Sequence, residues 1–286
     1  MSKTILLTGA SSGFGKLAVP LLLERGHTVI AGIRGGSSRL ESIFFAERKK
    51  FGDKLLAIDL HLDKQETFAG AKELIDNRFG GKLDVLINNA GFGLFGPLED
   101  LTDQQLRHQF EVNFFGPVLL SRLLLPALRA ARGRVLNVSS IVGLVAFPYY
   151  GSYAASKFAL EAMTESLFYE LKPFGVQAGL IEPGAFKTDF TTRSKMLPEG
   201  RAHSSPASYA ARVSALDRFM TQTSGRQGNP RQVAKLIVKL VEKKRVPLRN
   251  IVGADARSLY FVKRLIPDSW RVFLEEFVFR KVVFRD

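Results

Sequence analysis

The sequence contains no cysteine, and its 286 residues include only four histidines and one tryptophan. Without cysteine the chain cannot form disulfides, thiolate zinc sites or a cysteine nucleophile. The histidines lie far apart and show no metal-ligand spacing; they are His27, His61, His108 and His203. We therefore expect neither a metal site nor a metalloenzyme.

Long uncharged apolar runs are lacking as well. The longest candidate, residues 116–128, is shorter than the roughly 18 residues that a membrane span needs, and it includes Arg122. The first residues, MSKTILLTGASSG, enter a strand at once, without the apolar core or the small-residue cleavage site of a signal peptide. These features predict a cytoplasmic protein.

Acidic residues are few relative to basic ones, with 27 Asp and Glu against 41 Lys and Arg, a formal charge of +14. Residues 229–286 hold 14 basic and 6 acidic residues, so 14 − 6 = +8 of this charge lies in a C-terminal segment that is also rich in aromatics. Such a segment can bind an anionic membrane surface. We favour the alternative that its aromatics pack on the domain or on a second subunit. No motif supports nucleic-acid binding.

Short apolar runs alternate with stretches of helical periodicity along the chain. Six of these runs predict strands: Thr4–Thr8, Thr28–Ile33, Leu55–Ile58, Val85–Ile87, Val135–Val138 and Gln177–Ile181. Strands that alternate with helices in this way form βαβ units and a parallel sheet. We expect an α/β protein with a Rossmann-type, doubly wound parallel sheet flanked by helices, in a single domain over residues 1–286.

The alternation weakens over residues 190–229, which are rich in Ser, Thr, Gly, Arg and Ala. A long insertion of this kind in a compact domain is typical of a lid or a binding loop. We predict a mobile substrate-binding insertion there. A helix over Arg231–Lys244, a strand near Asn250–Gly253 and a basic, aromatic-rich helical tail over 256–286 are expected to follow.

A glycine-rich turn follows the first predicted strand. Gly9, Gly13 and Gly15 lie between that strand and a helix, where glycines allow the backbone to approach a pyrophosphate at the helix N-terminus. A site for NAD usually places an acidic residue at the end of the second strand. Ile33 and Arg34 occur there instead, which favours a 2′-phosphate and hence NADP(H) over NAD(H). A turn without a ligand and a solvated Arg34 remain the alternatives.

Polar and small residues end the third and fourth predicted strands. Asp59 and Leu60 are suited to an adenine, and residues 88–91, Asn-Asn-Ala-Gly, allow close approach of the cofactor. Ligands of such sheets bind outside the carboxyl ends of the strands. The sequence therefore predicts a dinucleotide site along this edge.

Tyr153 and Lys157 lie four residues apart at the start of a helical stretch, and Ser140 lies thirteen residues before Tyr153. Residues at i and i+4 share a helix face, so we expect the ammonium to favour the phenolate and to lower the pKa of Tyr153. A phenol adjusted in this way is a general acid and base for a carbonyl and alcohol pair.

Together these motifs resemble the short-chain dehydrogenase/reductase family. The glycine turn, residues 88–91, Asn113, Ser140, Tyr153, Lys157 and then Pro183-Gly184 with Thr188 occur in that family's order and spacing. The match covers residues 3–190. A weaker resemblance, in residues 181–190 and the basic C-terminus, is to the branch of 17β-hydroxysteroid and retinol dehydrogenases.

The resemblance implies a role for each matching residue. Tyr153 would protonate the substrate oxygen, Ser140 would hold that oxygen, and Lys157 would bind the ribose and lower the pKa of Tyr153. Asn113 would support a water that links Lys157 to solvent. The implied cofactor-binding residues are Gly9, Ser11, Ser12, Gly13, Phe14, Gly15, Arg34, Asp59, Leu60, Asn89, Ala90, Gly91, Tyr153, Lys157, Pro183, Gly184 and Thr188.

The expected function is transfer of a hydride between NADP(H) and the carbonyl or alcohol of an apolar, steroid-, retinoid- or lipid-like substrate. Aromatic residues near the implied nicotinamide position favour such a substrate; they are Phe92, Phe95, Phe147, Tyr149, Phe186 and Phe190. The alternatives are a 3-oxoacyl-thioester reductase that acts on a carrier protein, and a non-catalytic NADP(H)-sensing protein. The resemblance also implies a homodimer or homotetramer.

Overall fold

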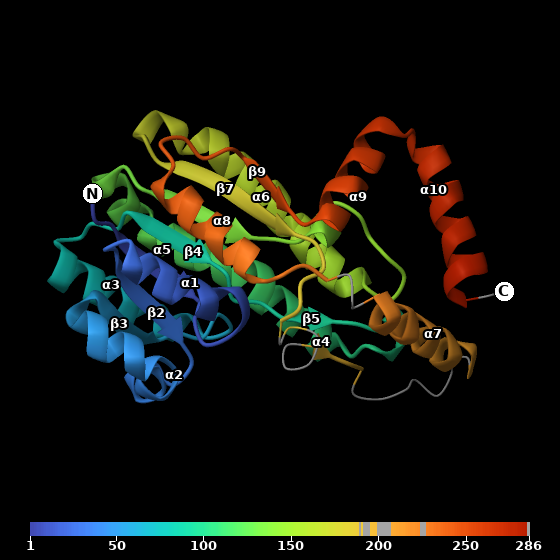
Figure 1. Cartoon of the computed structure of the whole chain (residues 1–286), viewed down its shortest axis with the longest axis horizontal. Helices are drawn as coiled ribbons and strands as arrows, with labels where there is room; N and C mark the ends of the chain where they lie inside the picture. The colour runs from blue at the N-terminus through green and yellow to red at the C-terminus, as the bar shows by residue number, and fades with distance from the viewer. Residues whose placement is uncertain (189, 191–194, 199–206, 224–226, 285–286) are drawn as a thin grey trace.

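The computed structural model describes residues 1–188, 190, 195–198, 207–223 and 227–284, and its centre is a seven-stranded parallel sheet (Figure 1). The strand order is β3-β2-β1-β4-β6-β7-β9. The strands are β1 (Thr4–Thr8), β2 (Thr28–Ile33), β3 (Leu55–Asp59), β4 (Val85–Asn88), β6 (Arg134–Val138), β7 (Gln177–Pro183) and β9 (Arg249–Val252). The predicted single-domain, doubly wound α/β fold is confirmed, and each predicted strand ends within two residues of its expected bounds.

Helices cover both faces of the sheet, because successive side chains of a buried strand point to opposite sides. Ile5 and Leu7 of β1 join one hydrophobic cluster, and Leu6 between them joins the other. The helices of the first cluster are α1 (Gly13–Glu24), α2 (Gly36–Phe51) and α8 (Arg231–Glu242). Those of the second are α3 (Phe68–Phe79), α5 (Gly116–Ala131) and α6 (Gly151–Glu170).

The chain reverses its direction of winding between β3 and β4. After β3 forms one edge, the chain returns to the centre and pairs β4 with β1 in parallel, so that Ile5 lies opposite Val85. The carboxyl ends of β1 and β4 diverge into different connections at this point. Open parallel sheets bind their ligands at such a switch point.

One helical stretch, Asp103–Ala131, is long and apolar enough to cross a membrane by length and composition alone. It consists of α4 (Asp103–Phe110), a π-helical turn (Glu111–Phe115) and α5. Leu120, Leu124 and Leu128 of α5 are buried in the cluster beneath the sheet. The stretch is therefore explained as a core helix of the domain.

The described part of the predicted insertion contains a short strand and a helix. β8 (Lys195–Met196) pairs with β5 (Gly93–Leu94), and α7 (Ala207–Thr223) follows. Residues 189, 191–194, 199–206 and 224–226 lie outside the described residues, so the mobility of the insertion stays a prediction. The sequence analysis did not predict α7, although its alanines favour a helix.

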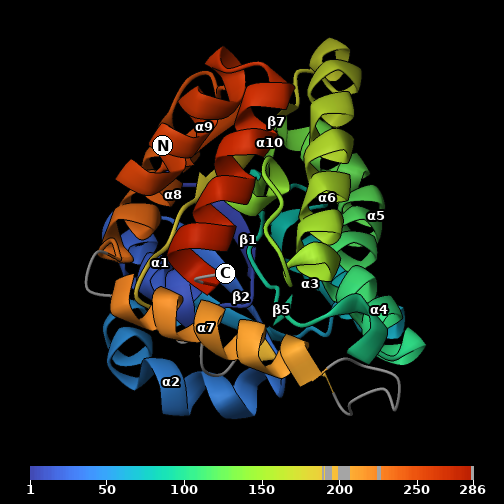
Figure 2. The same cartoon turned by 90° about the vertical axis from the view of Figure 1, so that its right-hand side faces the viewer.

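The C-terminal tail forms α9 (Ala254–Leu265), α10 (Asp268–Phe277) and a π-helical end (Val278–Phe284). α9 and α10 project from the domain as a hairpin, and Figure 2 shows α10 and α7 in front of the sheet. No residue of α10 is buried, and Trp270 and Phe273 are 68% and 67% exposed. Trp270 and Phe273 therefore do not pack on the described part of the domain, and the expected packing on a second subunit stays a prediction.

Candidate active site

The glycine-rich turn packs against the residues that follow β4, and two of its glycines, Gly9 and Gly15, leave no room for a side chain. A Cβ on Gly9, which has a φ of +66°, would lie 2.8 Å from the Cα of Ala90. A Cβ on Gly15 would lie 2.7 Å from Nδ2 of Asn89, whose amide donates to the carbonyl of Thr8 at 3.0 Å. The close approach of Gly9 and the side-chain amide of Asn89 thus hold the two strand ends together at the switch point.

The N-terminus of α1 opens directly from this turn. Gly13 has a φ of +52°, and the side chain of the N-cap residue Ser12 makes no capping hydrogen bond. The first N–H groups of a helix lack partners within the helix and favour an anion. Ser11, Ser12 and Gly13 thus lie where the sequence predicts the pyrophosphate.

One of the predicted aromatic residues, Phe186, lies elsewhere than the sequence analysis expected. The ring of Phe14 packs edge-on against that of Phe186, with centroids 5.8 Å apart. Phe186 is 5% exposed and belongs to the main hydrophobic cluster. The interpretation of Phe186 as a substrate-facing aromatic is corrected: it is a core residue that packs against Phe14, at the start of α1.

The ends of β2 and β3 meet at the predicted adenosine position. Asp59 Oδ1 accepts the N–H of Gly35 at 2.7 Å and contacts Nε2 of His61 at 3.0 Å. Leu60 is buried and packs so close to Gly32 that a Cβ there would lie 2.8 Å from it. Arg34 is exposed at this edge.

A second guanidinium, that of Arg39, lies at the same turn and was missed by the sequence analysis. Arg39 donates to the carbonyl of Arg34 at 3.4 Å, and its Cδ lies 2.9 Å from the position of a Cβ on Gly35. The signal that could have found it is the short distance in sequence between two arginines after an apolar strand end. Together the two arginines make this turn cationic.

Asn113 and Lys157 approach each other at Gly91. A Cβ on Gly91 would lie 3.1 Å from Oδ1 of Asn113 and 3.6 Å from Nζ of Lys157. Asn113 is fully buried in the π-helical turn. Its amide accepts from the N–H of Phe92 at 3.0 Å and donates to the carbonyl of Phe92 at 2.8 Å and to Oγ of Ser156 at 3.2 Å. π-Helical turns inside α-helices are frequent at functional sites.

Tyr153 is 7% exposed and shares a hydrogen bond with the side chain of Ser140. Burial raises the pKa of the phenol well above its usual value, and the hydrogen bond with Ser140 opposes this rise only in part. The sequence analysis expected Lys157 to lower this pKa, and the direction in the structure is the opposite. The cause is desolvation, which disfavours the phenolate of a buried ring.

Lys157 lies beside the tyrosine, with Nζ 5.9 Å from the centre of the Tyr153 ring. Its ammonium donates to the carbonyl of Val138 at 2.9 Å. Burial lowers the pKa of Lys157 to about 8, while the negative charge of Glu161 acts against the shift. The predicted catalytic set of Asn113, Ser140, Tyr153 and Lys157 is therefore gathered in one place.

A buried charge cluster lies behind Lys157, and the sequence analysis did not find it. Arg249 of β9 contacts Glu161 at 2.5 Å, Glu182 at 2.7 Å and Glu165 at 2.9 Å. Burial raises the pKa of Glu161 to about 8, and it raises that of Glu182 as well. The partners lie on α6, β7 and β9, so no local spacing indicates their contact.

The predicted nicotinamide loop after β7 is attached to α9. Asp255, in the first turn of α9, accepts the N–H of Ala185 at 2.6 Å. Its carboxylate packs against Gly184, where an added Cβ would overlap both oxygens. Thr188 lies four residues on, and its hydroxyl accepts the N–H of Phe190 at 3.3 Å. Asp255 is thus a further residue of this site, contributed by the tail.

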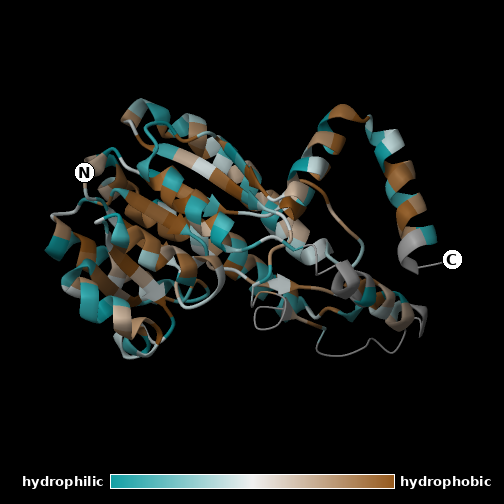
Figure 3. Ribbon diagram, in the orientation of Figure 1, coloured by the Kyte–Doolittle hydropathy of each residue, from teal (hydrophilic) through white to brown (hydrophobic). Residues whose placement is uncertain are grey.

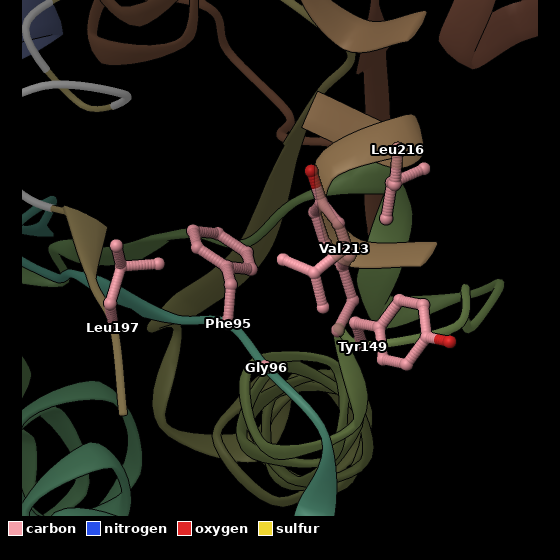
Figure 4. A pocket seen from close by; sticks show the side chains of 7 residues that line it. Phe95, Gly96, Tyr149, Leu197, Val213 and Leu216 are labelled. Atoms are coloured by element: carbon pink, nitrogen blue, oxygen red, sulfur yellow. The ribbon is translucent and has the colours of Figure 1, made fainter. Parts of the chain in front are cut away.

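Two aromatic rings pack against Tyr153. The centroids of Phe95 and Phe190 each lie 5.6 Å from that of Tyr153. A pocket opens beside them, and α7 forms one of its walls (Figure 4). Its labelled lining residues are Phe95, Gly96, Tyr149, Leu197, Val213 and Leu216.

Two of the other predicted aromatics lie near this pocket, and one faces elsewhere. Tyr149 lines it with a φ of +66°, a conformation that non-glycine residues adopt at a cost of about 1–3 kcal/mol and mostly at functional sites. Phe147 packs on Tyr150 with centroids 6.3 Å apart. Phe92 instead stacks on His108 of α4 at 5.1 Å.

Comparison with known proteins agrees with this geometry. Residues 3–197 match the short chain dehydrogenase family. A 3-ketodihydrosphingosine reductase of Bacteroides thetaiotaomicron is 34% identical over 93% of both chains, and a retinol dehydrogenase 8 of Bos taurus is 34% identical over 93% of this chain and 86% of its own. A solved short-chain dehydrogenase from Streptomyces avermitilis superposes with a TM-score of 0.81 at 33% identity, over 96% of each chain.

The chain belongs to the short-chain dehydrogenase/reductase family. It is an oxidoreductase of the class that interconverts an alcohol and a carbonyl group with a nicotinamide cofactor.

Proposed function

We propose that the protein is an NADP(H)-dependent oxidoreductase that transfers a hydride between the nicotinamide and the carbonyl or alcohol carbon of an apolar, lipid-, retinoid- or steroid-like substrate. The observation that carries this proposal is the setting of Tyr153. Its ring contacts those of Phe95 and Phe190, and its hydroxyl shares a hydrogen bond with Ser140. A proton donor enclosed by aromatic rings suits an apolar carbonyl compound.

The residues around the switch point fit a dinucleotide, because neither Gly9 nor Gly15 leaves room for a Cβ and the first turn of α1 is open to an anion. When bound, the nicotinamide supplies or accepts the hydride. We assign the pyrophosphate to residues 9–15, the adenosine to Asp59 and Leu60, and the nicotinamide end to residues 89–91 with Pro183, Gly184 and Thr188. Arg34 would bind the 2′-phosphate, for which NAD(H) has no counterpart.

The proton chemistry follows from the pKa directions. Burial keeps Tyr153 protonated, which is the form needed to donate a proton to a carbonyl oxygen that Ser140 holds. The reverse reaction needs the phenolate, and the positive charge of Lys157 is the group placed to stabilise it. Asn113 would support the water that returns a proton by way of Lys157.

The names of the relatives support an apolar substrate. By their names, one is a reductase of 3-ketodihydrosphingosine and another a dehydrogenase of retinol, and both of these molecules have a long apolar body. The small pocket lined by Phe95 and Tyr150, next to the ring contact of Phe95 with Tyr153, has the matching character, since its lining combines aromatic and aliphatic side chains.

The proposal includes a cytoplasmic location and two kinds of contact. One is a second copy of the chain, in a dimer or tetramer formed through the helices that carry Asn113 and Tyr153. Phe115, Phe158 and Tyr169 on these helices are exposed apolar side chains that support such an interface. The other is contact of the C-terminal segment with a membrane.

The test is NADPH oxidation with a panel of long-chain ketones, retinal, steroid ketones, small aldehydes and a 3-oxoacyl thioester. We expect turnover of one apolar carbonyl class, reduced by roughly 10²–10⁴-fold in Tyr153→Phe while NADPH still binds. Turnover of a carrier-bound thioester alone would replace the proposed substrate class. NADPH binding without turnover of any carbonyl would point to the sensing protein.

A further inference from the structure

The C-terminal hairpin of α9 and α10 exposes a continuous series of large apolar side chains. Figure 3 shows these apolar segments on the two helices that project from the domain. The most exposed are Leu265 at 77%, Trp270 at 68%, Phe273 at 67%, Phe261 at 57% and Phe277 at 55%. We refer to these five residues as the hairpin face.

The spacing places much of this face on one stripe. Trp270, Phe273 and Phe277 are separated by three and four residues, as on one side of an α-helix. A protein surface rarely leaves aromatic and aliphatic side chains exposed together unless the surface binds something. Within the described residues, no part of the domain covers α10.

An aromatic path leads from the hairpin to the catalytic tyrosine. Phe279 packs on Phe147 with centroids 6.2 Å apart, and Phe147 packs on Tyr150 at 6.3 Å. Tyr150 contacts Phe95 at 4.4 Å, and Phe95 contacts Tyr153 at 5.6 Å. Ring contacts thus lead from Phe279, directly after α10, to the candidate active site.

The charges of the hairpin indicate what can bind there. Residues 254–284 hold six Lys and Arg and four Asp and Glu, so 6 − 4 = +2. All four carboxylates already have partners: Asp268 and Glu275 contact Arg271, Glu276 contacts Arg280, and Asp255 accepts from backbone. The remaining positive charge, within a chain of +14, attracts an anionic surface and repels a second copy of the same face.

We propose that the hairpin face binds an anionic lipid bilayer, and that the apolar substrate passes from the bilayer to Tyr153 along the aromatic path. The substrate part rests on the proposed oxidoreductase activity, whereas the bilayer part deepens the proposed membrane contact and does not depend on that activity. Aromatic and aliphatic side chains enter the boundary between headgroups and acyl chains, while neighbouring cations bind anionic headgroups. The bilayer supplies both contacts at once.

Trp270 provides a direct measurement, because it is the only tryptophan in the chain. Vesicles of phosphatidylcholine with phosphatidylserine should shift its fluorescence to shorter wavelength and carry the protein upward in a flotation assay. Pure phosphatidylcholine vesicles should bind more weakly. No shift and no flotation with either vesicle would overturn the proposal, and so would a dimer that shields Trp270 without lipid.

A triple variant, Leu265→Ser with Phe273→Ser and Phe277→Ser, keeps the tryptophan and should weaken binding at least about tenfold. The matched control changes three exposed apolar residues elsewhere, Phe45→Ser with Leu98→Ser and Phe174→Ser, and should bind as the native protein does. Equal binding by the two triple variants would contradict the hairpin assignment.

Turnover of a water-soluble and of a vesicle-embedded carbonyl tests the bilayer contact and the proposed function separately. The hairpin variant should reduce a water-soluble carbonyl at the native rate but a vesicle-embedded one more slowly. If the native protein floats but reduces no carbonyl, the proposed function fails while the bilayer contact stands. If both forms reduce the embedded substrate equally, the path from the bilayer is wrong.

Discussion

At the scale of single residues, the choice of cofactor depends on the turn after β2. The side chain of Ile33 is buried, so the strand end offers no carboxylate for a ribose hydroxyl. Arg34 and Arg39 instead make the turn cationic, and Asp59 is engaged by the N–H of Gly35. A 2′-phosphate would meet two guanidinium groups there, with which it can form charge-assisted hydrogen bonds.

Arg34→Asp should raise the Kd of NADPH by roughly ten- to a hundredfold while that of NADH changes little, because only NADPH carries the phosphate. Both constants can be measured from the quenching of protein fluorescence. Lys54→Asp makes the same charge change directly before β3, at the amino ends of the strands and away from the cofactor site, and should leave both constants nearly unchanged. An equal loss for the two cofactors in Arg34→Asp would place the phosphate elsewhere.

The local motifs of the site could be predicted, and its long-range partners could not. Tyr153 and Lys157 are four residues apart on one helix, so their spacing alone indicates a shared face. Arg249 reaches Glu161 across 88 residues of sequence, and Asp255 reaches Ala185 across 70. No periodicity encodes such contacts. The pKa of Tyr153 also needed the structure, because the degree of burial decides its direction.

At the scale of elements, the strands were predictable because buried parallel strands are short, continuous apolar runs bounded by turn residues. The segment over 190–229 was interpreted from its polar and small residues, and these concealed the helix α7, which forms a wall of the pocket. The tail was expected to be helical, yet its attachment to the nicotinamide loop through Asp255 was not expected. The helix α9 and the loop that follows β7 therefore act as one unit.

Gly184→Ala should disturb this unit, because the new Cβ would overlap the carboxylate of Asp255. We expect a destabilisation of about 1–3 kcal/mol and weaker NADPH binding, measured by thermal unfolding and titration. Gly70→Ala on α3, where a Cβ meets nothing within 4 Å, is the control and should be neutral or stabilising. In an Asp255→Ala background the same change at Gly184 should cost less, and full additivity would show that the two residues do not interact.

At the scale of the whole molecule, the buried charge cluster connects the sheet to the helix that carries the candidate catalytic residues. Glu161 lies on α6, Glu182 on β7 and Arg249 on β9, so their contacts join three elements distant in sequence. Two buried carboxylates share this one guanidinium, and breaking up such a group is costly. The cluster therefore links the global stability of the protein to pH as well as supporting Lys157 from behind.

Glu161→Gln should change how the stability of the protein depends on pH. The pKa of Glu161 is about 8 in the folded protein, against 4.5 for an ordinary glutamate, so the folded state binds more protons between these values. Stability from this group is fully present below about pH 4.5 and is lost as pH rises toward 8.

Glutamine cannot titrate, so the Tm of the variant minus that of the native protein should rise from pH 5 to pH 8. Glu165→Gln, which removes the half-exposed partner of Arg249 on the same helix, is the control for the loss of a carboxylate contact to Arg249. A flat difference for Glu161→Gln would mean that Glu161 is ionised in the folded protein at neutral pH and that Arg249 fully compensates its burial.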